Sequence, residues 1–164
     1  MISVNRYFIT IGFLRREQKM ILPEYVTPKE VARVCAEMGM DDWSKRTEAV
    51  VSTQESSKIL AIVNTEGMPI PPEDFRMGLT VELEHGTRFK DANVTNNHPI
   101  LTGKIVLAHL KETMDYYRRI DVAELEGDLL KAVLSGNVAK ITSKYKKLIE
   151  AQKSLNEVVA DQLK

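Results

Sequence analysis

The segment VAKITSKYKKLIEAQKSLNEVVADQ, residues 138–162, carries the clearest periodic pattern in the chain and predicts an α-helical fold. Its stripe positions alternate in spacings of three and four residues, which is typical of a helix that buries one face. The eight positions are Val138, Ile141, Tyr145, Leu148, Gln152, Leu155, Val159 and Gln162. Two interpretations stay open from the sequence: the helix docks on its own domain, or it pairs with another chain.

Helix-start signals precede two further apolar patterns. The segment TPKE at 27–30 has the spacing of a capping box with proline in the first helical position, and its helix is expected to end at Gly39. The segment PPED at 71–74 places two acids in a first turn, where the helix dipole favours them, and its helix is expected to run to Gly86.

A third helix is expected to begin at Pro99 and to continue without a break toward Glu126. Residues 59–63 (ILAIV) are ambiguous, because a short apolar run fits a buried strand as well as the end of a helix. The predicted fold class is mainly α: a helical hairpin or bundle core, a long C-terminal helix and a short N-terminal strand.

The chain divides into three segments by pattern. Residues 1–22 alternate like a strand and then become basic, which predicts an N-terminal strand or tail. An amphipathic anchor, or an extension ahead of a start at Met20, stays open as an alternative. Residues 23–128 are expected to form the helical core domain, and residues 129–164 a C-terminal helix that serves as an assembly element.

The composition excludes several classes of protein. With 43% apolar and 28% charged residues the chain is not extensively disordered, and no apolar run approaches the ~18 residues of a membrane span. The 23 basic and 23 acidic side chains cancel, so nucleic acid is not an expected partner. The one cysteine, Cys35, cannot form an internal disulfide and fits a reducing, cytoplasmic setting.

Two of the three histidines stand three residues from a glutamate, which makes them candidate metal ligands. Glu82 and His85 form one pair, and His109 and Glu112 form the other. Residues three apart project from one helix face, so each pair can bind one ion. Two imidazoles and two carboxylates suit a single divalent zinc, iron or manganese ion. The alternative is a buried hydrogen-bonded network in which each carboxylate orients its histidine.

The loop at residues 87–98 must pack back along the next helix for these pairs to meet. His85 ends its helix, whereas His109 lies ten residues into the following one, roughly 15 Å along its axis at 1.5 Å per residue. We therefore expect Asn93, Thr95 or Asn96 near the ligands. The side chains predicted to support the site are Glu84, Asn93, Asp115, Tyr116 and Tyr117.

The ordered motifs are ELEHG at 82–86, NVTN at 93–96, AHLKE at 108–112 and DYY at 115–117. Together they resemble a small uncharacterised family, a domain of unknown function found in bacteria, archaea and tailed phages. The resemblance covers about residues 74–120. It implies a helical hairpin with a shared polar site, and it implies a virion or phage accessory role. The chain departs from the pattern at Asn97-His98, where relatives tend to have an acidic pair, and at Met114, where they have proline.

The first functional prediction is a small helical structural or assembly protein that a Glu/His polar or metal site stabilises. It is expected to form homo-oligomers or larger assemblies through residues 138–162 and the N-terminal strand. Its expected location is the cytoplasm, or the virion if a phage encodes it. The alternative is a mononuclear metal-dependent hydrolase or oxidoreductase, with Glu84 or Asp115 as general base. Because no substrate-recognition motif is present, the sequence favours a protein that is not an enzyme.

Overall fold

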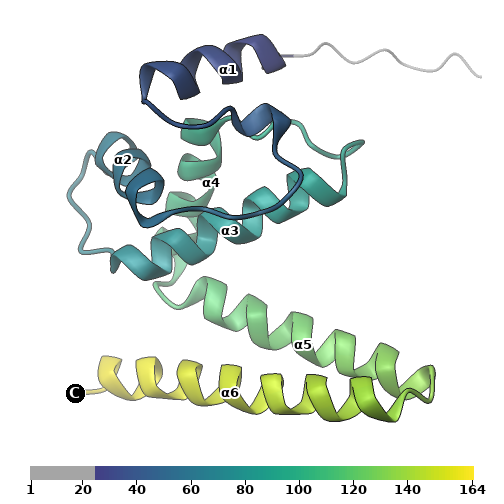
Figure 1. The fold of residues 1–164 in the computed structure, drawn as a ribbon. Coiled ribbons are helices and arrows are strands. Elements are labelled where there is room, and N and C mark those ends of the chain that lie inside the picture. Colours follow the sequence, from purple (N-terminus) through teal and green to yellow (C-terminus); the bar gives the residue numbers. More distant parts are fainter. Residues whose placement is uncertain (1–24) are drawn as a thin grey trace, which may run out of the picture.

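Six α-helices and one short 3-10 helix make up residues 25–164, the part of the chain that the computed structural model describes (Figure 1). The helices are α1 (Pro28–Glu37), η1 (Trp43–Lys45), α2 (Thr53–Val63), α3 (Pro72–Arg88), α4 (Pro99–Glu112), α5 (Tyr116–Leu134) and α6 (Val138–Gln162). The mainly α fold with its long C-terminal helix is confirmed. The strand predicted within residues 1–22 lies outside the described residues. None of the helices between residues 25 and 164 is long and apolar enough to cross a membrane.

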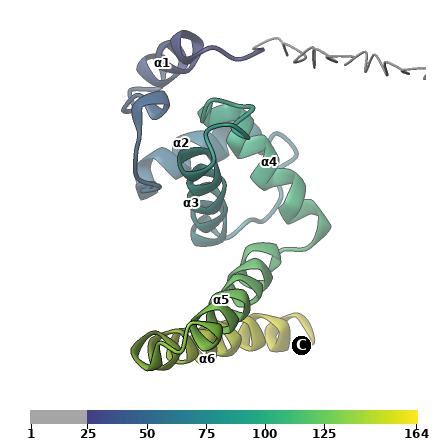
Figure 2. The same cartoon turned by 90° about the vertical axis from the view of Figure 1, so that its right-hand side faces the viewer.

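The helices form two parts: a core of α1 to α4, and an antiparallel hairpin of α5 and α6 at one end of it (Figures 1 and 2). Within the core, α2, α3 and α4 pack against one another, while α1 contacts η1 and α4. The side chains fully buried between them are Val31, Cys35, Trp43, Ile59, Phe75, Leu79, Leu83 and Val106.

The N-terminal caps explain where the first two helices begin. The Thr27 hydroxyl oxygen accepts the backbone N–H of Glu30 at 3.2 Å, as the capping-box pattern predicts. At α2, Ser52 and Glu55 form a reciprocal capping box. The ambiguous residues 59–63 belong to this helix, because the cap at Ser52 commits the following run to helical geometry.

The single helix predicted from Pro99 to Glu126 is wrong, because the chain breaks between α4 and α5. Thr113 is extended at φ −159° and ψ 137°, and its hydroxyl donates to Asp115 Oδ1 at 2.6 Å. Arg119 donates to both oxygens of that carboxylate, at 2.9 and 2.7 Å, and this holds the pKa of Asp115 below its ordinary value. Asp115 is only 1% exposed, so the turn supplies the partners that a buried carboxylate requires.

A three-residue turn joins α5 to α6. Gly136 takes φ +65°, a left-handed conformation that glycine adopts without strain, and the Asn137 side chain accepts the N–H of Lys140 at 3.0 Å. The predicted stripe of α6 faces α5 only in part: Leu148 is buried, whereas Val138 and Tyr145 are exposed. Docking on its own domain therefore accounts for one portion of the stripe and leaves another uncovered.

Arg118 connects the hairpin to the core. Its guanidinium donates to Asp74 Oδ1 of α3 at 2.5 Å and to the Ser154 hydroxyl of α6 at 2.6 Å. Both charged side chains are largely buried, at 20% and 10% exposure. One residue of α5 thus fixes the hairpin against the core and α6 against α5.

Candidate functional site

A hydrogen-bonded group of three side chains joins α3, α4 and α5. The Tyr117 hydroxyl donates to Glu82 Oε1 at 2.9 Å, and its oxygen lies 2.9 Å from His109 Nδ1. The same His109 nitrogen is 3.4 Å from Glu82 Oε1. Because a tyrosine has one hydroxyl proton, which goes to Glu82, His109 donates from Nδ1 to the Tyr117 oxygen. We call Glu82, His109 and Tyr117 the polar triangle.

Aromatic packing closes the polar triangle on one side. The Tyr116 ring stacks on the His109 ring with centroids 4.2 Å apart and an interplanar angle of 8°. Tyr117 is 2% exposed, while the side chains of Glu82 and His109 are 16% and 28% exposed. Burial, followed by the negative charge of Glu82, raises the pKa of Tyr117 well above its ordinary value, so the phenol stays a proton donor.

His85 contacts the opposite oxygen of Glu82. Its Nδ1 is 3.7 Å from Glu82 Oε2, and its Nε2 is 3.9 Å from Glu124 Oε1 on α5. The His85 side chain is about half exposed. Glu124 is not among the residues predicted from the sequence, because no local spacing relates a residue of α5 to a histidine of α3. No pattern in the sequence could have indicated that pair.

The structure brings three of the four predicted metal ligands to one place. Glu82 contacts both His85 and His109, but each histidine meets a different carboxylate oxygen. Glu112, the last residue of α4, is exposed and does not join them. Within residues 25–164 no group of three or more His, Cys, Asp or Glu side chains could hold a metal ion. A bound zinc, iron or manganese ion therefore stays a prediction.

The predicted supporting residues fall into different surroundings. Glu84 is exposed on α3 and forms an ion pair with Arg88 at 2.8 Å. The Asp115 carboxylate accepts hydrogen bonds from Thr113 and Arg119 in the turn between α4 and α5. Tyr116 and Tyr117 are the two that contact the predicted ligands directly. Asn93 lines a cleft beside Glu82 and His85.

An open cleft of about 310 Å³ lies beside the polar triangle. Glu82 and His85 form one wall, and the loop residues Asn93 and Thr95 form another, as the length of the loop predicted. Asn93 Nδ2 donates to the carbonyl oxygen of Gly86 at 3.1 Å, which fixes the loop on α3. We call this the polar cleft.

Gly86 makes that loop packing possible. A Cβ atom at this position would lie 1.9 Å from Oδ1 of Asn97, a distance that no side chain tolerates. Asn97 is buried and, like Asn96, has a positive φ, at 62° and 48°. Asparagine is among the few residues that take this conformation readily. The two asparagines allow the loop to turn, and Gly86 leaves the space into which Asn97 packs.

We expect the Tyr117→Phe substitution to lower the free energy of unfolding by about 1–2 kcal/mol. It removes the hydroxyl that Glu82 and His109 share and leaves both with an unmet partner. Tyr116→Phe is the matched control, because the Tyr116 hydroxyl forms no hydrogen bond with residues 25–164 and its ring still stacks on His109. Urea denaturation followed by circular dichroism measures both. Equal effects of the two substitutions would contradict a structural role for the triangle.

Comparison with known proteins places the chain in one family. Searches of the curated proteins and of the solved structures found no match. A family model described as "Protein of unknown function (DUF5661)" matches residues 31–126, more than half of the 164 residues. The matched range contains the polar triangle and the polar cleft, and it ends before α6. The chain therefore belongs to the DUF5661 family of proteins of unknown function.

Proposed function

We propose that the protein is a small helical structural protein that assembles with a second copy of itself through the α5–α6 hairpin. The proposal rests on one observation, which is the distribution of exposed apolar side chains along the chain. Among residues 25–164, twelve large hydrophobic side chains are exposed, and seven of them lie between residues 130 and 163. Those seven are Leu130, Val133, Leu134, Val138, Tyr145, Ile149 and Leu163. All lie beyond residue 126, where the family match ends.

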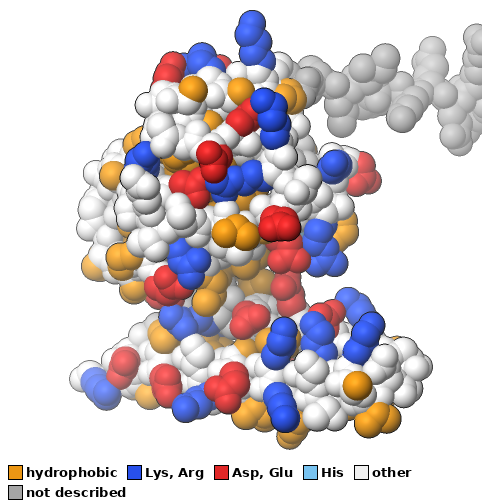
Figure 3. Space-filling model, viewed as in Figure 1, with side chains coloured by type: hydrophobic (Ala, Val, Ile, Leu, Met, Phe, Trp, Pro, Cys, Tyr) orange, Lys and Arg blue, Asp and Glu red, His pale blue; other side chains and the backbone are white. Residues whose placement is uncertain are grey.

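Helical periodicity puts most of these residues on one side of the hairpin. On α6, Val138, Tyr145 and Ile149 follow spacings of seven and four, beside the face on which Leu148 is buried against α5. On α5, Leu130 and its neighbours project to the same side, since the helices are antiparallel. Figure 3 shows apolar side chains at the lower edge of the hairpin. We call this the apolar side; patches of this kind mark protein contacts.

The charges along α6 favour a second copy as the occupant. Apart from Lys140 and Lys144, which lie on the other side of the hairpin, residues 138–149 contain two lysines and no acid, whereas residues 150–162 contain three acids and one lysine. When two copies of α6 pair antiparallel about a two-fold axis, the basic half of each lies against the acidic half of the other. Parallel pairing would instead set like charges against each other. The axis passes near Ile149, at the boundary of the two halves.

The substitution Ile149→Glu tests this arrangement. Near the two-fold axis it places two like charges against each other in an apolar contact, which should weaken the dimer at least about 100-fold. Light scattering over a concentration series should give twice the chain mass of 18.6 kDa for the natural protein and a single chain mass for the variant. Ile62→Glu on α2 is the control, since Ile62 is 49% exposed and Ile149 is 45% exposed.

Two results would overturn the proposal: a natural protein that stays monomeric at every concentration, or an Ile149→Glu variant that still dimerises. In this proposal the polar triangle has a structural role, because it joins the three helices from which the hairpin extends. The resemblance to a family found in bacteria, archaea and tailed phages supports a virion or phage accessory setting as part of this proposal. The metal-dependent enzyme stays a prediction from the sequence.

A further inference from the structure

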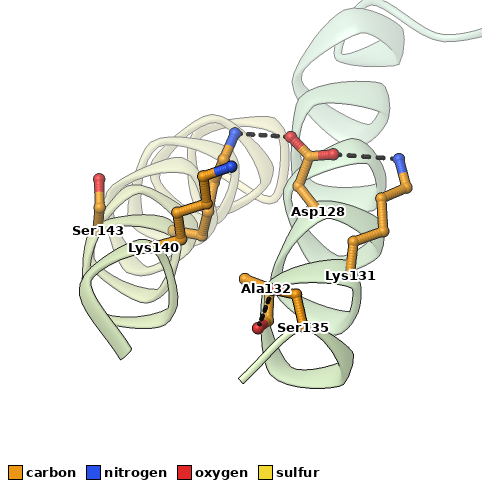
Figure 4. A pocket seen from close by; sticks show the side chains of 7 residues that line it. Asp128, Lys131, Ala132, Ser135, Lys140 and Ser143 are labelled. Atoms are coloured by element: carbon orange, nitrogen blue, oxygen red, sulfur yellow. Dashed lines mark hydrogen bonds and ion pairs between the residues drawn. The ribbon is translucent and has the colours of Figure 1, made fainter. Parts of the chain in front are cut away.

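A second cleft, of about 360 Å³, lies between the last turns of α5 and the first turns of α6 (Figure 4). Lys131 comes from α5, and Lys140, Ser143 and Lys144 come from α6. Helical periodicity places these residues on the side of the hairpin opposite the apolar side. We call this the lysine cleft. Like the apolar side, it lies beyond the residues that the family model matches.

The lysine cleft carries uncompensated positive charge. Asp128 accepts from Lys144 at 2.6 Å and from Lys131 at 3.2 Å, which lowers the pKa of Asp128 (dashed lines in Figure 4). One carboxylate therefore offsets three ammonium groups, and two positive charges remain. The Lys140 ammonium group forms no ion pair or hydrogen bond with residues 25–164.

Two hydrogen-bond donors without a partner among the described residues, on Lys140 and Ser143, indicate which class of ligand the cleft could bind. Lys140 and Ser143 are three residues apart on α6 and both line the cleft; the Lys140 side chain extends toward α5, and Ser143 lies at the outer edge, on the side of α6 away from α5 (Figure 4). The Ser143 hydroxyl has no partner among the described residues, whereas the Ser135 hydroxyl already donates to Ala132 O at 2.9 Å. An ammonium group and a hydroxyl that line the same cleft suit a tetrahedral oxyanion, because both donate to its oxygens.

We propose that the lysine cleft binds the phosphate group of a small phosphorylated molecule. Its volume is in the range of small-molecule sites, and Ala132 with the lysine methylenes gives the rest of such a molecule an apolar wall. The formal net charge of the chain is zero, so the positive charge is local. A local excess attracts a compact anion, whereas a nucleic acid needs an extended basic surface. The inference does not depend on dimer formation.

The test is a titration of the full chain with inorganic phosphate, followed by two-dimensional NMR of the ¹⁵N-labelled protein at constant ionic strength. We expect saturable shifts confined to the amides around Lys140 and Ser143, and tighter binding of a phosphate monoester. The double substitution Lys140→Gln, Ser143→Ala should weaken binding about tenfold or more. Lys153→Gln, which removes the same charge from the same helix outside the cleft, should change it less than about twofold.

Three results would overturn the inference. Shifts that do not saturate, or that spread over all lysines, would show general screening. Equal weakening by Lys153→Gln would show that net charge alone matters. Binding of duplex DNA without competition from phosphate would show a surface for polyanions. Circular dichroism of the double variant serves as the folding control, since Lys140 and Ser143 are both exposed.

Discussion

The Trp43→Ala variant is expected to lose about 3–5 kcal/mol of the free energy of unfolding. Trp43 is 0% exposed, and its indole N–H donates to Glu55 Oε1 at 3.0 Å. The Arg46 guanidinium lies 5.2 Å from the centre of its ring. Removing the side chain leaves a cavity and takes a donor from Glu55. Since a domain is stable by about 5–15 kcal/mol, the loss is a large fraction of the total.

Urea denaturation followed by far-ultraviolet circular dichroism measures the effect, because the variant has no tryptophan left to report it. Trp43→Phe is the matched control: it keeps most of the ring and removes the N–H group. We expect its midpoint to fall between those of the natural protein and the alanine variant. A Trp43→Ala midpoint equal to that of the natural protein would contradict the packing described for η1.

Gly78→Ala should lower the free energy of unfolding by about 1–3 kcal/mol. An added Cβ would lie 2.5 Å from Tyr117 Cε2 and 2.5 Å from Val106 Cγ1, where α3, α4 and α5 meet. The Tyr117 ring cannot move aside without breaking its hydrogen bonds to Glu82 and His109. The clash therefore reaches the polar triangle as well as the core.

Gly127→Ala is expected to act in the opposite direction. Gly127 lies within α5, and an added Cβ would meet nothing within 4 Å. Alanine there reduces the entropy of the unfolded chain and should stabilise the protein by about 0.5–1 kcal/mol. The same denaturation curves give both values. Shifts of the same sign for the two glycines would show that helix propensity, rather than close approach, governs position 78.

Local chemistry made most helix boundaries predictable. Caps and prolines act within one turn, so the starts of α1, α3 and α4 could be located from Thr27, Pro72 and Pro99. The break between α4 and α5 could not, because no glycine or proline marks it. Asp115 interrupts the helix through contacts with Thr113 and Arg119, two and four residues away, and a Thr, an Asp and an Arg at these spacings also occur within continuous helices.

For the candidate site, the sequence could predict which residues share a helix face, but not how the helices meet. Spacing predicted that Glu82 and His85 share a helix face, and the length of the loop at 87–98 allowed His109 to come near them; Glu82 lies 3.7 Å from His85 and 3.4 Å from His109. It also put Glu112 on the face of His109, but α4 ends there and the carboxylate is exposed. The shared hydroxyl of Tyr117 depends on how α5 crosses α3, which is a tertiary relation that no spacing within one helix encodes.

The position of the one tryptophan determines which changes in this protein intrinsic fluorescence can detect. Trp43 is buried in η1, which Figures 1 and 2 place at the end of the core away from the hairpin. Its fluorescence emission therefore changes when water enters the α1–α2 region and does not change when only α5 and α6 are affected. Unfolding of the core and pairing of the hairpin thus have separate optical signatures: intrinsic fluorescence for the first, and scattering for the second.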